Sequence, residues 1–105
     1  MVVTFTLDGM PFQALNGGPQ YKHTEAASIS VTTRNQEETD RLWSKLTADG
    51  GAESRCGWLK DRFGVSWQIV PHILPKLLDS PDRQAADRAM QTMLQIKKID
   101  IAALE

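Results

Sequence analysis

Alternating apolar and polar residues near the start of the chain predict a β-hairpin. Residues 2–7 follow the period of a strand, with Val3, Phe5 and Leu7 on one face. The turn signal Asp8-Gly9 separates them from a second run at residues 11–15. The sequence Asn-Gly-Gly-Pro at 16–19 then ends the pattern, because these residue types favour turns.

Three further runs predict strands at residues 25–33, 54–61 and 65–70. The first carries Ser28 and Ser30 on the face opposite its larger apolar residues. Such small polar residues can line a cavity, and they can equally form a sparsely filled solvent face. The last two runs are separated by the turn sequence Arg-Phe-Gly at 62–64.

Two amphipathic segments predict helices. Asn35 is a favoured N-cap for a helix over residues 35–48, with Glu38 completing a capping-box pattern. A second helix is expected to begin at Ser80-Pro81-Asp82, and its predicted apolar face comprises Ala86, Ala89, Met90, Met93 and Leu94. The segment 72–78 is apolar but contains Pro75, which disfavours a long helix, and residues 100–105 add one possible turn.

Composition narrows the class of protein. The 105 residues predict one domain, and 12 basic against 13 acidic residues leave a net charge of −1. This balance argues against a basic nucleic-acid binder or a polybasic membrane binder. The single cysteine, Cys56, excludes an internal disulfide framework and fits a reducing, cytoplasmic location. No apolar run approaches the roughly 20 residues that cross a bilayer.

A short pattern occurs twice. The segments 9–15 (GMPFQAL) and 64–70 (GVSWQIV) share Gly-x-x-aromatic-Gln-apolar-apolar, and each is predicted to form the second strand of a hairpin. We interpret this repeat as a structural duplication. The second copy is preceded by its own strand and helix, whereas the first copy has only its hairpin.

The segment 50–71, GGAESRCGWLKDRFGVSWQIVP, closely resembles the signature of bacterial PhnB-like proteins. Leu7-Asp8-Gly9 and the segment 15–19 resemble the preceding hairpin of the same family. These proteins carry the label 3-demethylubiquinone-9 3-methyltransferase and belong to the glyoxalase/bleomycin resistance, or vicinal oxygen chelate, superfamily. The resemblance implies an α+β fold of paired βαβββ modules whose curled mixed sheets enclose a cupped pocket.

Within that fold, we expect one domain with three parts. Residues 1–19 would be the hairpin of a first module that lacks its leading strand and helix, 20–71 a complete second module, and 72–105 a C-terminal helical tail. The missing wall implies either an internal start or a partner chain that supplies it. The open sheet edge and apolar surface therefore predict a homodimer.

The resemblance also implies positions for metal ligands, which this sequence does not fill with suitable residues. The last-strand glutamates of the two modules fall on Gln13 and Gln68, and the first-strand position of the second module falls near Ala26, within about two residues. A neutral amide is a poor replacement for a carboxylate, and alanine cannot bind a metal. His23 alone does not make a site, so we expect neither a metal nor a cofactor.

The methyltransferase label is not supported by a cofactor motif. The glycines at 17 and 18 follow a strand but lead into another strand, with Pro19 in place of a phosphate-binding amide. We therefore predict a metal-free protein that binds a small apolar or aromatic molecule. Superfamily enzymes, whether a methyltransferase or a metal-dependent lyase or dioxygenase, remain an alternative, as does a truncated homologue that only dimerises.

The candidate residues of the pocket each have a structural alternative. Glutamine amides can bind a ligand or satisfy neighbouring strands, tryptophans can stack on a ligand or fill a core, and Asn16 can line the pocket mouth or only form a turn. Trp67 should point away from Gln68, toward the helix. Cys56 is expected to be a structural thiol. The predicted pocket comprises Gln13, Asn16, Ser28, Ser30, Trp58 and Gln68.

Overall fold

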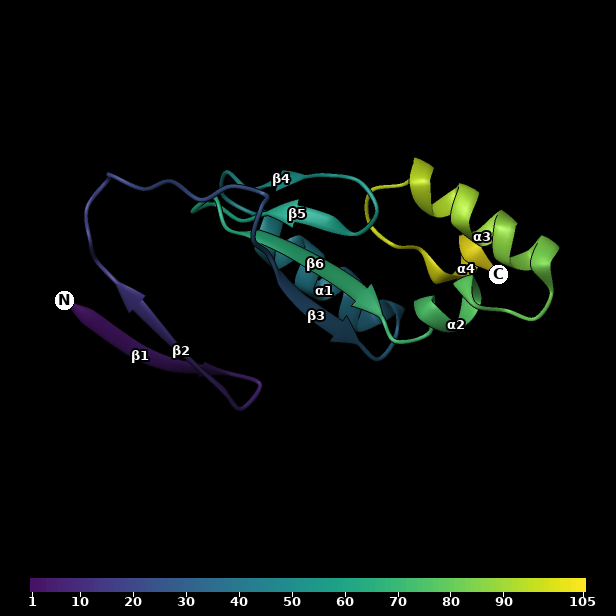
Figure 1. Ribbon diagram of the computed structural model, residues 1–105, viewed down its shortest axis with the longest axis horizontal. Coiled ribbons are helices and arrows are strands. Elements are labelled where there is room, and N and C mark those ends of the chain that lie inside the picture. Colours follow the sequence, from purple (N-terminus) through teal and green to yellow (C-terminus); the bar gives the residue numbers. More distant parts are fainter.

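The computed structural model describes residues 1–105 as an elongated molecule of 52 × 26 × 22 Å. Figure 1 shows its three parts in sequence order: an N-terminal hairpin, a central sheet with one helix, and a group of C-terminal helices at the far end. No helix is long and apolar enough to cross a membrane. The N-terminal end of the molecule thus consists of strands and the C-terminal end of helices, and only the central part contains both.

The hairpin consists of β1 (Val2–Leu7) and β2 (Met10–Leu15), which pair only with each other. Asp8 and Gly9 both have positive φ, 51° and 81°, which matches the predicted tight turn between twisted strands. The rings of Phe5 and Phe12 stack across the strands with centroids 5.6 Å apart. No hydrogen bond joins the hairpin strands to the central sheet or to the helices.

The central sheet has the strand order β3-β6-β5-β4, formed by Ile29–Thr33, Ser66–Pro71, Trp58–Lys60 and Ala52–Glu53. β3 runs parallel to β6, and the other neighbours are antiparallel. In the chain, α1 follows β3, and β4, β5 and β6 come after it. The predicted βαβββ module, and with it the α+β class, is thus confirmed.

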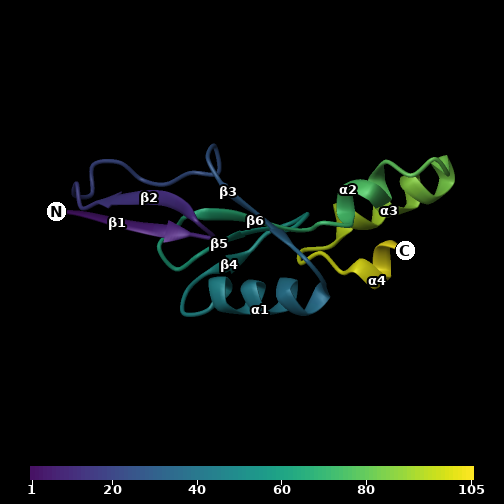
Figure 2. The same ribbon diagram turned by 90° about the horizontal axis from the view of Figure 1, so that it is seen from below.

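Helix α1 (Gln36–Thr47) covers one face of this sheet. Its N-cap is Asn35 as predicted, with the Asn35 side chain accepting a 2.9 Å hydrogen bond from the Glu38 amide. Trp43 on the helix packs on Leu59 and Ile69 of the sheet, and all three are buried. Figure 2 shows α1 along one side of the sheet and no helix on the other. The opposite face is therefore free of helices.

The C-terminal helices are α2 (Leu74–Leu78), α3 (Arg83–Gln95) and α4 (Ile101–Leu104). They share a second core of Leu74, Ala89, Ile99 and Leu104. The Gln36 side chain fastens this tail to α1, because its Nε2 donates to the Ile99 carbonyl and its Oε1 accepts from the Ile101 amide. The tail is consequently part of the same folded body as the module.

Two predicted strands are wrong in their extent. The first begins at Ile29 instead of residue 25, because Thr24 forms a turn in which its hydroxyl accepts a hydrogen bond from the Ala26 amide. Of the second, predicted over 54–61, only Trp58–Lys60 forms a strand, β5, because a turn at Cys56 and Gly57, whose φ angles are 59° and 83°, separates it from the short strand β4 at Ala52–Glu53. The amides of Cys56 and Gly57 donate to carbonyls at positions 96 and 97, a tertiary contact that local alternation does not reveal.

Helix α3 also departs from expectation in two details. Its N-cap is Asp82, whose carboxylate accepts from two amides of the first turn, whereas Ser80 instead accepts from the Asp82 amide. Met90 and Leu94, predicted on the apolar face, are 40% and 49% exposed. The helix packs mainly against α2 and α4, and these two side chains stay partly in solvent.

Candidate functional site

The site begins with a row of side chains across the helix-free face of the sheet. Ser30 pairs with Gln68, and Gln68 pairs with Trp58, so three of the predicted pocket residues lie side by side in register. Trp67 packs toward Trp43 on α1, as predicted, which places Gln68 on the opposite face. Residues two positions apart in a strand lie on the same face. Ser66 therefore lies on the face of Gln68, and its partner Lys60 lies on the face of Trp58.

Gln68 is held in place by Ser28. Its Nε2 donates a 2.9 Å hydrogen bond to Ser28 Oγ, across 40 residues of sequence. Both side chains are half-buried. The bond fixes the amide on the sheet and leaves the Gln68 Oε1 and the Ser28 hydroxyl hydrogen without protein partners, so both can bind a ligand. Ser28, two residues from Ala26, thus stands where the first-strand position of the module was expected.

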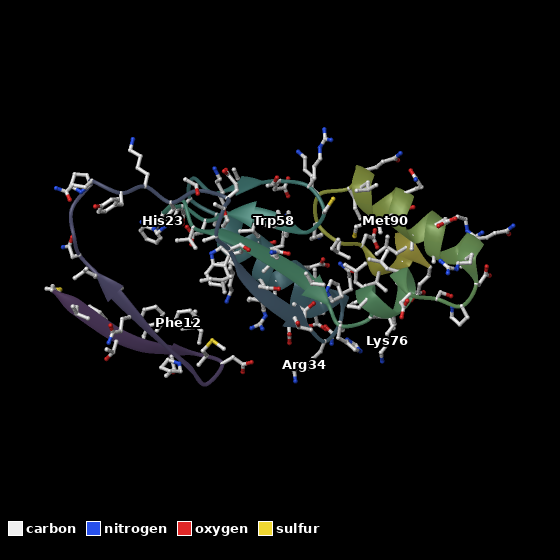
Figure 3. All side chains as sticks on the ribbon, viewed as in Figure 1. Phe12, His23, Arg34, Trp58, Lys76 and Met90 are labelled. Carbon is white, nitrogen blue, oxygen red and sulfur yellow. The ribbon has the colours of Figure 1, made fainter.

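A hollow of about 290 Å³ adjoins this row. Its walls come from the segment before β3 and from the start of β6. Eight residues line it: Lys22, His23, Thr24, Ala27, Ser28, Ile29, Val65 and Ser66. Figure 3 shows His23 on this connecting segment, close to the end of the sheet. The sheet face and the segment together therefore form a concave, partly enclosed site.

The connecting segment is tied to the sheet by an ion pair between Glu25 and Lys60. The hydrogen bond from Lys60 lowers the pKa of the Glu25 carboxyl. Lys60 lies on the helix-free face, so the pair connects that face to the segment before β3. The Lys60 and Glu25 side chains are 42% and 62% exposed, so solvent screens the pair and it contributes little to stability.

Gln13 and Asn16 lie on the hairpin, and the structure does not bring them to the sheet residues. Gln13 lines a separate hollow of about 590 Å³ whose other walls also belong to β1 and β2. The Asn16 amide donates to the Met1 carbonyl and closes the open end of the hairpin. The predicted pocket is thus divided between two sheets, with Ser28, Ser30, Trp58 and Gln68 on one and Gln13 and Asn16 on the other.

The residues at the implied metal positions do not fit a divalent cation. Gln68 supplies one neutral oxygen, Ser28 a hydroxyl, and the other glutamine lies on the hairpin. No group of three or more His, Cys, Asp or Glu side chains gathers anywhere in the structure. Without a carboxylate, the donor set lacks the charge that offsets the dehydration of a divalent ion.

Sequence reasoning missed Ser66, Thr24 and the ion pair of Glu25 with Lys60. Ser66 could have been found, because it precedes Gln68 by two positions and a strand places such residues on one face. Thr24 and Glu25 could not, since the turn that brings them over the sheet depends on contacts outside the strand pattern. Cys56 is free and half-buried and takes no part in the site.

The chain order β3-α1-β4-β5-β6, in which the first and last strands pair in parallel, defines a module of the glyoxalase/bleomycin resistance type. The family model for 3-demethylubiquinone-9 3-methyltransferase, the PhnB-like family, matches residues 1–70. The chain belongs to this family, which confirms the resemblance found in the sequence.

Two solved structures have the same fold. A PhnB protein from Bacillus cereus that bears the 3-demethylubiquinone-9 3-methyltransferase label is 32% identical, with a TM-score of 0.63, over 68% of this chain and 64% of that one. A protein from Pseudomonas aeruginosa is 21% identical, with a TM-score of 0.56, over 68% of this chain and 62% of that one. The chain therefore matches less than two thirds of the length of either structure. No curated protein matches it.

Proposed function

We propose that this chain binds a small molecule on the helix-free face of its central sheet. The observation that carries the proposal is the cross-strand row of Ser30, Gln68 and Trp58. A half-buried indole offers apolar area to a ligand, and an amide fixed by Ser28 offers a hydrogen-bond acceptor beside it. This combination suits a small aromatic or apolar molecule with one polar group.

The three tryptophans provide the test. Trp43 Nε1 donates to Glu53 and Trp67 Nε1 donates to Asp61, whereas Trp58 Nε1 has no such partner. Because the three indole N–H groups have different surroundings, we expect separate signals in a ¹H–¹⁵N correlation spectrum. Each signal can then be followed while a fragment library is titrated. Compounds that bind as proposed shift the Trp58 indole and the Gln68 side-chain amide, and leave the Trp43 indole in place.

A pair of variants sharpens this test. Gln68→Leu removes the acceptor and should weaken a binding compound at least fivefold. Gln91→Leu, which changes an exposed glutamine on α3, should leave its affinity unchanged. The proposal fails if no compound shifts Trp58 at high excess, or if both variants behave alike.

We propose further that binding requires no metal ion. The amide and hydroxyl donors at the implied ligand positions support this, since they favour hydrogen bonding over coordination of a divalent cation. Elemental analysis of the purified protein should find less than one tenth of an equivalent of any transition metal, on the order of background. One equivalent of a divalent ion bound to the purified protein would overturn the proposal that binding requires no metal.

A homodimer is the third part of the proposal. One face of the hairpin exposes Val3, Phe5 and Met10 at 50%, 41% and 62%, a concentration of apolar surface that a partner would cover. Sedimentation should show a dimer at tens of micromolar, and Phe5→Asp should dissociate it. Phe63→Asp, at an exposed phenylalanine in the turn before β6, should leave the dimer intact. A monomeric wild-type protein would contradict the proposal.

A further inference from the structure

The hydroxyl of Ser66 is buried without a hydrogen-bond partner. The residue is 1% exposed, and its Oγ is the one buried side-chain polar atom in the structure that lacks a partner. Buried polar atoms in folded proteins are nearly always bonded, so an exception at a hollow indicates a group that is completed by something bound there. Ser66 lines the 290 Å³ hollow beside Gln68.

Two more hydroxyls of this hollow have unused hydrogens. Thr24 Oγ1 accepts from the Ala26 amide, and Ser28 Oγ accepts from Gln68. In both bonds the hydroxyl acts as the acceptor, so its own hydrogen is free to be donated. With Ser66, the hollow therefore has three hydroxyl donors on walls from two different segments.

The side chains around the hollow also favour a negatively charged ligand. Lys22 and His23 line the hollow, and none of its lining residues is acidic. The neighbouring carboxylates are already occupied: Glu25 pairs with Lys60, and Asp61 accepts from the Phe63 and Val65 amides and from the Trp67 indole. The hollow is thus rich in donors and poor in acceptors, which favours a group that carries several acceptor oxygens and negative charge.

We propose that the Ser66 hollow binds an oxyanion, a carboxylate or a phosphoryl group, through the hydroxyls of Ser66, Ser28 and Thr24. This inference rests on the proposed function and names the polar end of its ligand. The aromatic or apolar body lies on Trp58, the Gln68 amide contacts the centre, and the oxyanion occupies the hollow. The ligand class is a small aromatic or apolar acid.

The experiment compares three probes of similar shape on the full chain: benzoate, phenyl phosphate and the neutral benzamide. We expect benzoate or phenyl phosphate to bind at least tenfold more tightly than benzamide, with shifts of the Ser66 and Ser28 amides. The tighter of the two acids identifies the oxyanion. Inorganic phosphate alone should compete with phenyl phosphate and not with benzamide.

Ser66→Ala should weaken the acid that binds at least fivefold and leave benzamide unaffected. Ser44→Ala, at an exposed serine on α1, should change neither. Removal of an unbonded hydroxyl does not threaten folding, so the variant remains interpretable. The inference is overturned if benzamide binds as well as the acids, or if Ser66→Ala binds them normally, as a hollow that holds only an ordered water would predict.

These outcomes are separable from failure of the proposed function. If neutral aromatic compounds shift Trp58 while the acids gain nothing, the small-molecule site stands and the oxyanion hollow does not. If neither the acids nor any neutral compound shifts Trp58, both proposals fail.

Discussion

Gly57 and Ile69 lie so close together that a side chain at position 57 has no room. The Ile69 amide donates to the Gly57 carbonyl at 2.8 Å, and a Cβ at Gly57 would meet the Ile69 carbonyl oxygen at 2.9 Å and the Ile99 side chain at 3.1 Å. The backbone at Gly57 also has a φ of +83°. This position joins β5, β6 and the C-terminal tail, and it therefore needs glycine for both space and conformation.

Gly57→Ala should consequently destabilise the protein by about 2–4 kcal/mol, the sum of a left-handed conformation and a clash with backbone. Urea unfolding followed by tryptophan fluorescence measures the change. Gly64→Ala is the matched control, because its φ is similar at +88° but only His23 Cβ lies within contact distance, at 4.0 Å. We expect it to cost about 1 kcal/mol. Equal losses in the two variants would show that close packing at Gly57 is unimportant.

Gln36 should be the main attachment of the tail to α1. Gln36→Leu keeps the volume but removes the bonds of 2.9 Å to the Ile99 carbonyl and 2.8 Å from the Ile101 amide. We expect a loss of about 1–3 kcal/mol, since partly buried backbone groups lose their partners. Hydrogen exchange at the Ile101 amide should accelerate more than in the core of the sheet. The control Gln91→Leu should change neither quantity, and unchanged exchange at Ile101 in Gln36→Leu would contradict the prediction.

The local elements could be predicted from the sequence because their signals are local. Asn35 caps α1 and Asp8-Gly9 turns the hairpin through contacts within three or four residues. The break at Cys56 and Gly57 has a different origin, since their amides bind the carbonyls of Ile96 and Lys97, some 40 residues away. No pattern in the strand itself carries that information, so the long strand expected there was wrong.

In the candidate site, too, some features follow from local sequence patterns and others depend on long-range contacts. Strand alternation shows which residues of one strand share a face, and the pairing of the strands then puts Ser30, Trp58 and Gln68 on the same face. The partner of Gln68 is Ser28, which depends on the parallel register of β3 and β6 and on the turn that precedes β3. Gln13 has the same place in the sequence repeat as Gln68 but lies on a separate sheet. A repeat identifies equivalent positions, and it does not determine that they share one cavity.

The ion pair of Asp40 with Lys98 should make the tail contact sensitive to acid. Their atoms lie 2.8 Å apart, and hydrogen bonds from Lys98 and then Gln36 lower the pKa of the Asp40 carboxyl below its usual 3.8. Because the folded pKa is the lower one, the stabilisation is fully present above the unfolded value and is lost as the pH falls through the folded value. The loss therefore occurs below about pH 4.

Lys98→Met should raise the pKa of Asp40 toward 3.8, which a carboxyl-detected NMR titration measures. Lys97→Met removes the same charge from an exposed neighbour without an ion pair, and it should leave the Asp40 midpoint nearly unchanged. An Asp40 titration identical in wild type and Lys98→Met would show that the contact does not persist in solution.

The bond from Trp43 Nε1 to Glu53 Oε1, 2.7 Å long, should fix the two-residue strand β4 against α1. Trp43 is 4% exposed, so its indole N–H has no ready access to water once the acceptor is removed. We expect Glu53→Met to cost about 1–2 kcal/mol and to move the Trp43 indole signal upfield. Glu53→Gln retains an oxygen acceptor at the same position and should cost less than about 0.5 kcal/mol. If both variants lose the same stability, the charge of Glu53 matters and the hydrogen bond to Trp43 does not.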